Sequence, residues 1–235
     1  MLFFSLLVSA SLGIRVKITT KEKIDATSFS NFSLKNNLLL IDSSVENIGS
    51  VSYLCRLRTN AYTSNASFLF WSYKKELKPG ETRNFKIYSF LPQKGEYRIE
   101  ISGYCGNQIF DFKNFSLAVS SDFNDSLNYK IINSFVVKNF LVLEIYSDRP
   151  DIVYVIPFDY PSSWIFESQK ISLKKGQNLV FLRFVGPLEK QEVGIAILNE
   201  SGKGSLSRML IKKENYLISF LRLSNTILSI FLRVW

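Results

Sequence analysis

Short runs of alternating apolar and polar residues, separated by turn residues, recur along the whole chain. In the first half these runs are GIRVKITTK, NLLLIDSSVENIG, VSYLCRLRT, NASFLFWSY, TRNFKIYSF, EYRIEISGY and QIFDFKNFSLAV, and in the second half NYKIINSFVV, NFLVLEIYS, DIVYVIPF, WIFESQKISL, QNLVFLRFV, EVGIAILN and SLSRMLIKK. Alternation with a period of two is typical of strands with one buried side. About seven short strands per hundred residues is the density of an immunoglobulin-like sandwich. The pattern predicts an all-β chain with two tandem immunoglobulin-like β-sandwiches.

An internal repeat supports this division. Residues 77–106 align without a gap to residues 173–202, and each copy has a basic turn closed by glycine and then two alternating strands. The identical pairs are Leu77 and Leu173, Lys78 and Lys174, Gly80 and Gly176, Phe85 and Phe181, Lys94 and Lys190, Glu96 and Glu192, Ile99 and Ile195, Ile101 and Ile197, and Gly106 and Gly202. Gly80 and Gly176 can supply the positive φ that a reversing turn needs. We therefore expect one sandwich over residues 14–119, a polar linker over 120–127 and a second sandwich over 128–213.

Turn motifs in the first module carry a family resemblance. They are an Asn-x-Gly turn, a Leu-x-Pro-Gly turn and a Pro-x-x-Gly-x-Tyr segment, formed by Asn47, Gly49, Leu77, Pro79, Gly80, Pro92, Gly95 and Tyr97. With these motifs the chain resembles the prokaryotic extracellular immunoglobulin-like modules grouped as CARDB or related fibronectin-type domains. In the second module only Leu173 and Gly176 match, since Gln191 and Val193 replace the Gly and Tyr of the last motif. The resemblance implies adhesion, scaffolding or presentation outside the cell.

The first thirteen residues, MLFFSLLVSASLG, have an apolar run from Leu2 to Val8 followed by small residues. This order is typical of a signal peptide with a small-residue cleavage site. No Lys or Arg precedes the run, which leaves a first buried strand as the alternative. The segment is too short for a spanning helix, because a bilayer core takes about 20 residues. We interpret residues 1–13 as a signal peptide.

The C-terminal segment, residues 214–235, has the pattern of an amphipathic helix. From Tyr216 to Trp235 it reads YLISFLRLSNTILSIFLRVW, and its polar side at helical spacing consists of Ser219, Arg222, Asn225, Thr226, Ser229 and Arg233. Such a helix can lie in the membrane interface, with Arg222 and Arg233 among anionic headgroups and Phe231 and Trp235 on the apolar side. The alternatives are a spanning anchor with snorkelling arginines, a helix docked on the second sandwich, or a hairpin turning at Ser224 and Asn225.

Composition and charge exclude several functions. The chain has no histidine, which excludes Ser-His-Asp and Cys-His catalysis and His-ligated zinc. No calcium-loop spacing, glycine-rich phosphate loop or nucleophile with a visible base occurs, so we expect no metal, no cofactor and no enzymatic activity. The net charge of +9 favours an anionic partner, but the cations are spread along the chain. Because the chain has the pattern of an exported protein, we expect no nucleic-acid partner.

Two cysteines, Cys55 and Cys105, fall on the inward-facing side of their predicted strands. A disulfide between them would close a loop of about 50 residues and stabilise the fold by about 4 kcal/mol in the chain-entropy model. Two reduced buried thiols are the alternative. Five Asn-x-Ser sequons, at Asn31, Asn65, Asn114, Asn124 and Asn199, are candidate glycosylation sites of an exported protein.

Two aromatic segments are candidate binding sites. NASFLFWSYKK is apolar on both strand faces, so Trp71 and Tyr73 could form a carbohydrate platform or a subunit contact. PFDYPSSWIF places Tyr160 and Trp164 beside prolines, which could project the rings from a rigid loop. The alternatives are that the second domain covers the first segment and that the rings of the second fold back to close the sandwich end.

We conclude from the sequence that the chain is an exported, non-catalytic protein on the extracellular side of the cell membrane. Its expected partners are the membrane surface or anionic lipid through the C-terminal helix, and a protein or cell-surface polysaccharide through the sandwiches. One alternative is a structural subunit of an envelope assembly, which would be a homo-oligomer contacting neighbours through the tail and the aromatic strand. Another is a carbohydrate-binding module.

Overall fold

The computed structural model describes residues 22–125, 129–186, 190–211 and 221–228. The first eight strands are β1 (Ala26–Lys35), β2 (Leu38–Asn47), β3 (Tyr53–Tyr62), β4 (Ser67–Trp71), β5 (Lys75–Leu77), β6 (Thr82–Phe90), β7 (Gly95–Cys105) and β8 (Gln108–Val119). The next eight are β9 (Tyr129–Val137), β10 (Phe140–Ser147), β11 (Asp151–Phe158), β12 (Ile165–Phe166), β13 (Gln169–Leu173), β14 (Gly176–Val185), β15 (Gln191–Asn199) and β16 (Gly204–Ile211). A short helix covers residues 221–228. The predicted all-β fold is confirmed.

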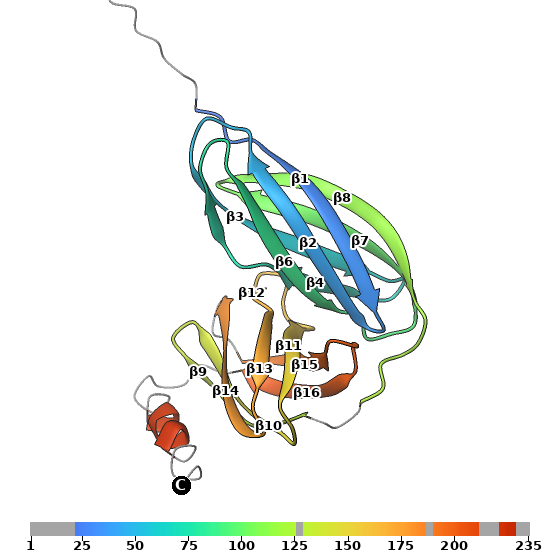
Figure 1. Ribbon diagram of the computed structural model, residues 1–235, viewed down its shortest axis with the longest axis vertical. Helices are drawn as coiled ribbons and strands as arrows, with labels where there is room; N and C mark the ends of the chain where they lie inside the picture. The colour runs from blue at the N-terminus through green and yellow to red at the C-terminus, as the bar shows by residue number, and fades with distance from the viewer. Residues whose placement is uncertain (1–21, 126–128, 187–189, 212–220, 229–235) are drawn as a thin grey trace, which may run out of the picture.

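The strands form four antiparallel sheets that face each other in pairs (Figure 1). In the N-terminal half, sheet β1-β2-β6 faces sheet β4-β3-β7-β8, and β5 also pairs with β3. In the C-terminal half, sheet β12-β14-β10-β9 faces sheet β13-β11-β15-β16. The two halves share a strand order except that β4 pairs with β3 whereas β12 pairs with β14, and the aligned sequence repeat falls on β6 with β14 and on β7 with β15. We call the two pairs of sheets the N-terminal sandwich and the C-terminal sandwich.

Two turn features of the N-terminal sandwich follow from its sequence motifs. Gly80 and Gly176 occupy equivalent turns with φ of 72° and 95°, as the repeat predicts. The phenol of Tyr97 lies in the core, donates to the carbonyl of Gln93 at 3.0 Å and accepts from the Gln93 N–H at 3.1 Å. This tyrosine-to-backbone corner at the start of a strand is a feature of immunoglobulin-like sandwiches.

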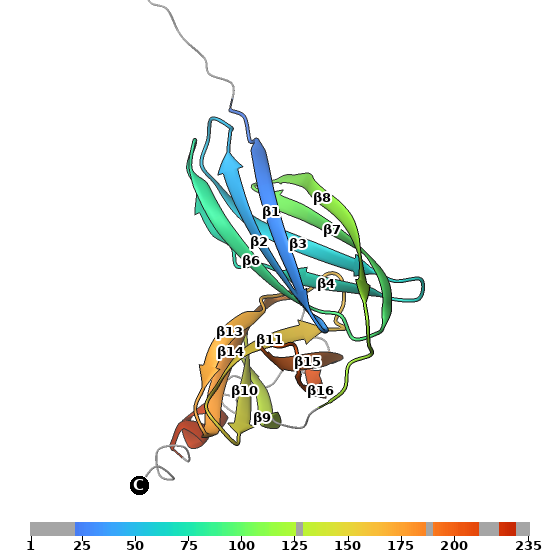
Figure 2. The same cartoon turned by 45° about the vertical axis from the view of Figure 1, so that its right-hand side comes forward.

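The sheet β13-β11-β15-β16 is buried on both faces at its centre. Val153 and Val155 of β11 pack in the core of their own sandwich, whereas Tyr154, Ile156 and Phe158 pack with the core of the N-terminal sandwich. Burial on both faces explains why β11 and β15 are almost continuously apolar instead of alternating. The N-terminal core therefore extends across the junction to the outer face of this sheet, while the C-terminal sandwich keeps a second core of its own, and the molecule is elongated with the contact at its middle (Figures 1 and 2).

Two glycines allow segments that are distant in sequence to come into close contact. A Cβ at Gly194 of β15 would lie 2.4 Å from the ring of Phe158, so only glycine leaves room for this ring between the sandwiches. Gly202, in the β15–β16 turn, has φ of 77°, and a Cβ there would lie 2.0 Å from the carbonyl oxygen of Lys35. At both places the residue type is dictated by the contact between two segments that are distant in sequence.

Candidate functional site

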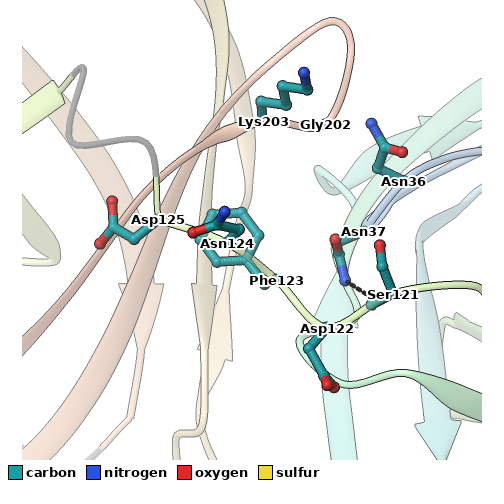
Figure 3. Close-up of a pocket in the computed structure, with 9 residues that line it drawn as sticks. All are labelled: Asn36, Asn37, Ser121, Asp122, Phe123, Asn124, Asp125, Gly202 and Lys203. Atoms are coloured by element: carbon teal, nitrogen blue, oxygen red, sulfur yellow. Dashed lines mark hydrogen bonds between the residues drawn. The ribbon is translucent and has the colours of Figure 1, made fainter.

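The junction of the two sandwiches is bordered by a polar hollow of about 300 Å³ (Figure 3). Its lining residues are Asn36, Asn37, Ser121, Asp122, Phe123, Asn124, Asp125, Gly202 and Lys203. The amide of Asn37 donates to the carbonyls of Leu91 at 2.7 Å and Ser121 at 3.1 Å, and the amide of Asn36 donates to Ser201 at 2.7 Å. These bonds fix the β1–β2 turn to both the connecting segment and the C-terminal sandwich.

The connecting segment is more ordered than its polar sequence indicates. The ring of Phe123 packs edge-on against the ring of Phe90 with centroids 5.1 Å apart, and the backbone N–H of Phe123 donates to the carbonyl of Pro92. The carboxylate of Asp125 accepts from the N–H of Leu206 at 3.2 Å. The carboxylates of this hollow are thus used in local hydrogen bonds, and in the described ranges no group of three or more His, Cys, Asp or Glu residues could hold a metal ion. We assign the hollow a mechanical role in joining the sandwiches.

A second hollow of about 290 Å³ is a groove where the outer face of sheet β1-β2-β6 meets β11 and β13. It is lined by Asn31, Phe32, Ser33, Leu40, Ile41, Asp42, Lys86, Tyr88, Tyr154 and Lys170. Both sandwiches contribute, because Tyr154 and Lys170 come from the C-terminal one. We call this hollow the tyrosine groove and treat it as the candidate binding site.

The strand register sets the order of groups in the tyrosine groove. Asn31, Asp42 and Lys86 form one cross-strand row on the outer face, and Ser33, Leu40 and Tyr88 form the next row toward the junction. The ring of Tyr88 then meets that of Tyr154 edge-on, with centroids 4.9 Å apart. The ammonium of Lys170 lies 5.3 Å from the centroid of Tyr154, so a lysine stands on each side of the tyrosine pair.

The groove lysines differ in their pairing. Lys86 lies 3.9 Å from the carboxylate of Asp42, at the limit of an ion pair, and both side chains are exposed. Lys170 hydrogen-bonds the carboxylate of Glu200 at 2.7 Å, and this bond is the main cause of its raised pKa. Burial raises the pKa of the Tyr88 phenol. At neutral pH the groove therefore presents the charged ammonium of Lys170 and the neutral phenol of Tyr88.

A second cluster lies at the junction around Trp71, which is only 5% exposed. The guanidinium groups of Arg56 and Arg58 lie 5.9 and 5.8 Å from its ring centroid, and Tyr104 packs edge-on at 5.0 Å. Trp71 also forms an isolated β-bridge with Glu167, which connects the N-terminal sandwich to the segment between β12 and β13. The cation–π contacts lie within the N-terminal sandwich, and the backbone pairing with Glu167 joins this cluster to the C-terminal sandwich.

The Glu167 carboxyl in this cluster is 2% exposed. Burial raises its pKa, while the charges of Arg183 and Arg56 and a hydrogen bond from the backbone of Lys74 lower it, and the net effect is an increase. Its Oε2 has no hydrogen-bond partner within the described part of the chain. The desolvation free energy of this carboxylate is therefore larger than the electrostatic stabilisation that the two arginines provide.

The structure corrects the prediction of exposed aromatic platforms. Trp71 is covered by the C-terminal sandwich, and Trp164, 1% exposed, is buried in the C-terminal core against Phe166 and Phe184. Tyr160 packs on the same core and donates its hydroxyl to the carbonyl of Leu69 at 2.8 Å, across the junction. These rings are buried at the junction or in the core instead of projecting to solvent. This arrangement agrees with the alternatives given above, that the second domain covers the first aromatic segment and that the rings of the second segment fold back onto the sandwich.

Tyr73 is the one predicted binding residue that keeps a large exposed area. Burial of the remainder of its ring and the nearby Glu167 carboxyl raise its pKa to about 12. Tyr73 is not among the residues that line the tyrosine groove.

Sequence reasoning did not single out the tyrosine groove. The alternation in TRNFKIYSF does place Lys86 and Tyr88 on the outer face of β6, which was an available signal. Tyr154 and Lys170 reach the groove only because the sandwiches pack together, and alternation within one strand cannot show this.

The predicted disulfide is confirmed. Cys55 and Cys105 are bonded, and they lie directly opposite each other on the adjacent strands β3 and β7. Both face the core. A structural disulfide in a protein of this kind indicates an oxidising compartment outside the cytosol.

The sequons differ in their surroundings. Asn31, Asn65, Asn114 and Asn124 are exposed, whereas Asn199 is half-buried. The side-chain oxygen of Asn199 accepts hydrogen bonds from the N–H groups of Ser201 at 3.0 Å and Lys203 at 3.1 Å. Glycosylation of any of them stays a prediction.

The described part of the tail is a short helix beside sheet β12-β14-β10-β9, at the end remote from the N-terminal sandwich (Figures 1 and 2). Arg222 is exposed on this helix, whereas the predicted membrane residues Phe231, Arg233 and Trp235 lie outside the described residues, as does the predicted signal peptide. Thr226 is 7% exposed, while Leu221 and Leu228 are 53% and 56% exposed. Within the described ranges, no helix is long and apolar enough to cross a membrane.

Comparison with known proteins gives no family. No protein-family profile and no curated protein matches the chain. Among solved structures, the N-terminal periplasmic domain of ScsB from Proteus mirabilis is similar over 80% of this chain and 92% of its own, with 10% identity and a TM-score of 0.33. Red sea bream transglutaminase is similar over 84% of this chain and 32% of its own, with 8% identity and a TM-score of 0.27. Likenesses of this strength carry no conclusion about activity or partners.

Proposed function

We propose that the chain is a non-catalytic, exported cell-surface protein, in which two joined sandwiches present a binding surface and the C-terminal segment attaches to the membrane. The Cys55–Cys105 disulfide supports an extracytoplasmic location. The turn motifs that resemble CARDB or fibronectin-type modules support a role in adhesion, scaffolding or presentation. The apolar contact across the junction, where residues of β11 and β15 pack in the N-terminal core, supports a rigid presenting unit over two freely moving domains.

The orientation of the short helix carries the membrane proposal. A helix that only docks on a protein turns its apolar residues inward and its polar residues outward. Here Thr226 faces inward, and Leu221 and Leu228 face outward. On the adjacent sheet, Phe140 and Phe181 are exposed and pack edge-on with centroids 6.5 Å apart. The outward leucines of this helix, together with the exposed phenylalanines of the C-terminal sandwich, thus offer apolar side chains that the acyl region of a membrane surface would cover.

Vesicle flotation of the full-length protein tests membrane attachment. The vesicles contain phosphatidylcholine and anionic phosphatidylglycerol, and the variant is Leu221→Glu with Leu228→Glu. Burying two leucines contributes about 3–6 kcal/mol, so the variant should lose at least about tenfold in bound fraction. Ile109→Glu is the matched control, because Ile109 is equally exposed but lies in the N-terminal sandwich. Equal flotation of the double variant and the wild type would contradict the proposal.

A subunit of an envelope assembly is the second candidate function. Its support is that the opposite end of the molecule also exposes apolar side chains, among them Ile48, Leu54 and Ile109. Contact between two different ends of an elongated molecule produces open filaments. Sedimentation velocity over a range of concentrations tests this candidate, and a monomer that does not change with concentration would exclude it.

A further inference from the structure

We propose that the tyrosine groove binds an acidic saccharide, with uronate carboxylates between Lys86 and Lys170 and a sugar ring against Tyr88. This inference deepens the proposed binding function and rests on it. The groove volume of about 290 Å³ lies near the lower end of small-ligand sites. It is built where two sandwiches meet, and interfaces between domains are frequent positions for ligand sites.

The floor of the groove favours a saccharide over an extended peptide. It is the outer face of sheet β1-β2-β6, where the main-chain groups of the central strand β2 are paired with strands on both sides. A peptide bound by strand addition needs an open strand edge, and the central strand β2 of the floor offers none. The floor instead offers short polar side chains, Asn31, Ser33 and Asp42, at the spacing of a strand pair. Their amide, hydroxyl and carboxylate groups match the donors and acceptors of sugar hydroxyls.

The aromatic and apolar groups of the groove would pack against the sugar ring. Tyr88 and Leu40 stand opposite each other on the floor, and Tyr154 closes the groove from the C-terminal sandwich. Tyrosine combines an apolar ring with a polar hydroxyl, which suits the mixed surface of a sugar. The edge-on contact between Tyr88 and Tyr154 fixes both rings before any ligand arrives, so little side-chain entropy is lost on binding.

The charges of the groove lysines favour an acidic saccharide over a neutral one. Lys86 and Lys170 flank the tyrosine pair, and the chain as a whole carries a net charge of +9. Asp42 is the groove's only carboxylate among its lining residues, and its distance of 3.9 Å from Lys86 leaves that ammonium accessible. Lys170 is hydrogen-bonded to the Glu200 carboxylate, so an anion bridging the two lysines shares the Lys170 ammonium with Glu200 and gains most from Lys86, and salt should weaken the binding.

Calorimetric titration of the full-length protein with trigalacturonic acid tests the inference. The protein is produced in a host without N-glycosylation, because a glycan on Asn31 would enter the same groove. The methyl ester of the same trisaccharide is the ligand control, since it keeps the rings and removes the charges. We expect the acid to bind at least tenfold more tightly than the ester.

The variants assign the binding to the groove. Lys86→Gln combined with Lys170→Gln should weaken binding of the acid at least tenfold, and Tyr88→Leu should weaken it as well. Lys130→Gln, which removes an exposed lysine of β9 outside the groove, should bind like the wild type. Thermal melting of each variant confirms that it is folded, and Lys86 and Lys170 are exposed enough for the double variant to remain stable.

Three results would overturn the inference: no heat of binding with the acid, equal affinity for acid and ester, or an equal loss in the Lys130 variant. The last result would mean attraction by the overall charge only. These outcomes are independent of the flotation assay, because Leu221 and Leu228 are not part of the groove. Loss of saccharide binding with flotation intact would refute the groove and leave the membrane proposal standing.

Discussion

Replacing Glu167 by Gln should leave the protein at least as stable at pH 7, although the substitution removes a carboxylate that faces two arginines. The carboxyl is almost completely buried, and burial raises its pKa more than Arg183, Arg56 and the Lys74 backbone together lower it. Gln keeps the size of Glu and can accept the same hydrogen bond from the Lys74 backbone. It removes a charge whose burial is unfavourable in the folded state.

The sign of the effect follows from proton linkage. Since the pKa of Glu167 is raised in the folded protein, its contribution to stability is complete below the unfolded-state pKa and is lost as the pH rises through the folded-state pKa. At pH 7 the Gln variant should therefore be at least as stable as the wild type, because it removes a buried charge whose desolvation outweighs the attraction of the arginines. At pH 4 the wild-type carboxyl is protonated, and the difference should disappear.

Urea unfolding at pH 7 and pH 4, followed by tryptophan fluorescence, measures this difference. A stabilising ion pair at Glu167 would make the Gln variant less stable at pH 7 by about 3–5 kcal/mol, and that result would refute the reasoning. Glu200→Gln is the matched control. The pKa of the wild-type Glu200 carboxyl is lowered by the hydrogen bond from Lys170, so the contribution of this carboxyl to stability is present at pH 7 and is lost as the pH falls. The two variants should thus differ from the wild type in opposite directions at pH 7.

Two further changes test the packing of the fold. Reducing the Cys55–Cys105 disulfide, or replacing both cysteines by Ser, should lower the free energy of unfolding by about 2–5 kcal/mol, measured by urea titration with and without reductant; an unchanged midpoint would contradict the structural role of the bond. Phe158→Ala should cost about 3–5 kcal/mol, because the ring is buried between the sandwiches and lies 5.1 Å from Phe90, centroid to centroid. Calorimetry of this variant should show the single unfolding transition of the wild type separating into two, and a wild type with two transitions would refute the apolar contact across the junction.

The regular strands of the fold were predictable from the sequence, but β1 was not. Period-two alternation identifies β6, β7, β10 and β14, because most of their inward positions are apolar. β1 lacks that signal, since its inward position Ser30 is polar and is satisfied in the core by a hydroxyl–hydroxyl bond of 2.7 Å with Ser43. The strand predicted at GIRVKITTK, residues 13–21, lies outside the described residues.

The candidate sites were harder to predict because they depend on contact between the sandwiches. The aromatic rings of Trp71 and Trp164 have the composition of a binding platform, and nothing in their own strands shows what covers them. The almost continuous apolar runs DIVYVIPF and EVGIAILN do indicate burial on both faces, which is the signal for the covering sheet. That signal does not show which segment covers the second face of these strands. The tyrosine groove and the Glu167 cluster could therefore be identified only from the structure.

Fractionation of cells that produce the native protein tests the central claim, that this is an exported protein held at the membrane surface. We predict that protease added to intact cells degrades it, that carbonate releases it from membranes, and that intact mass shows Cys55 and Cys105 oxidised. Recovery of a protected protein from the cytosol, with both thiols free, would contradict the account.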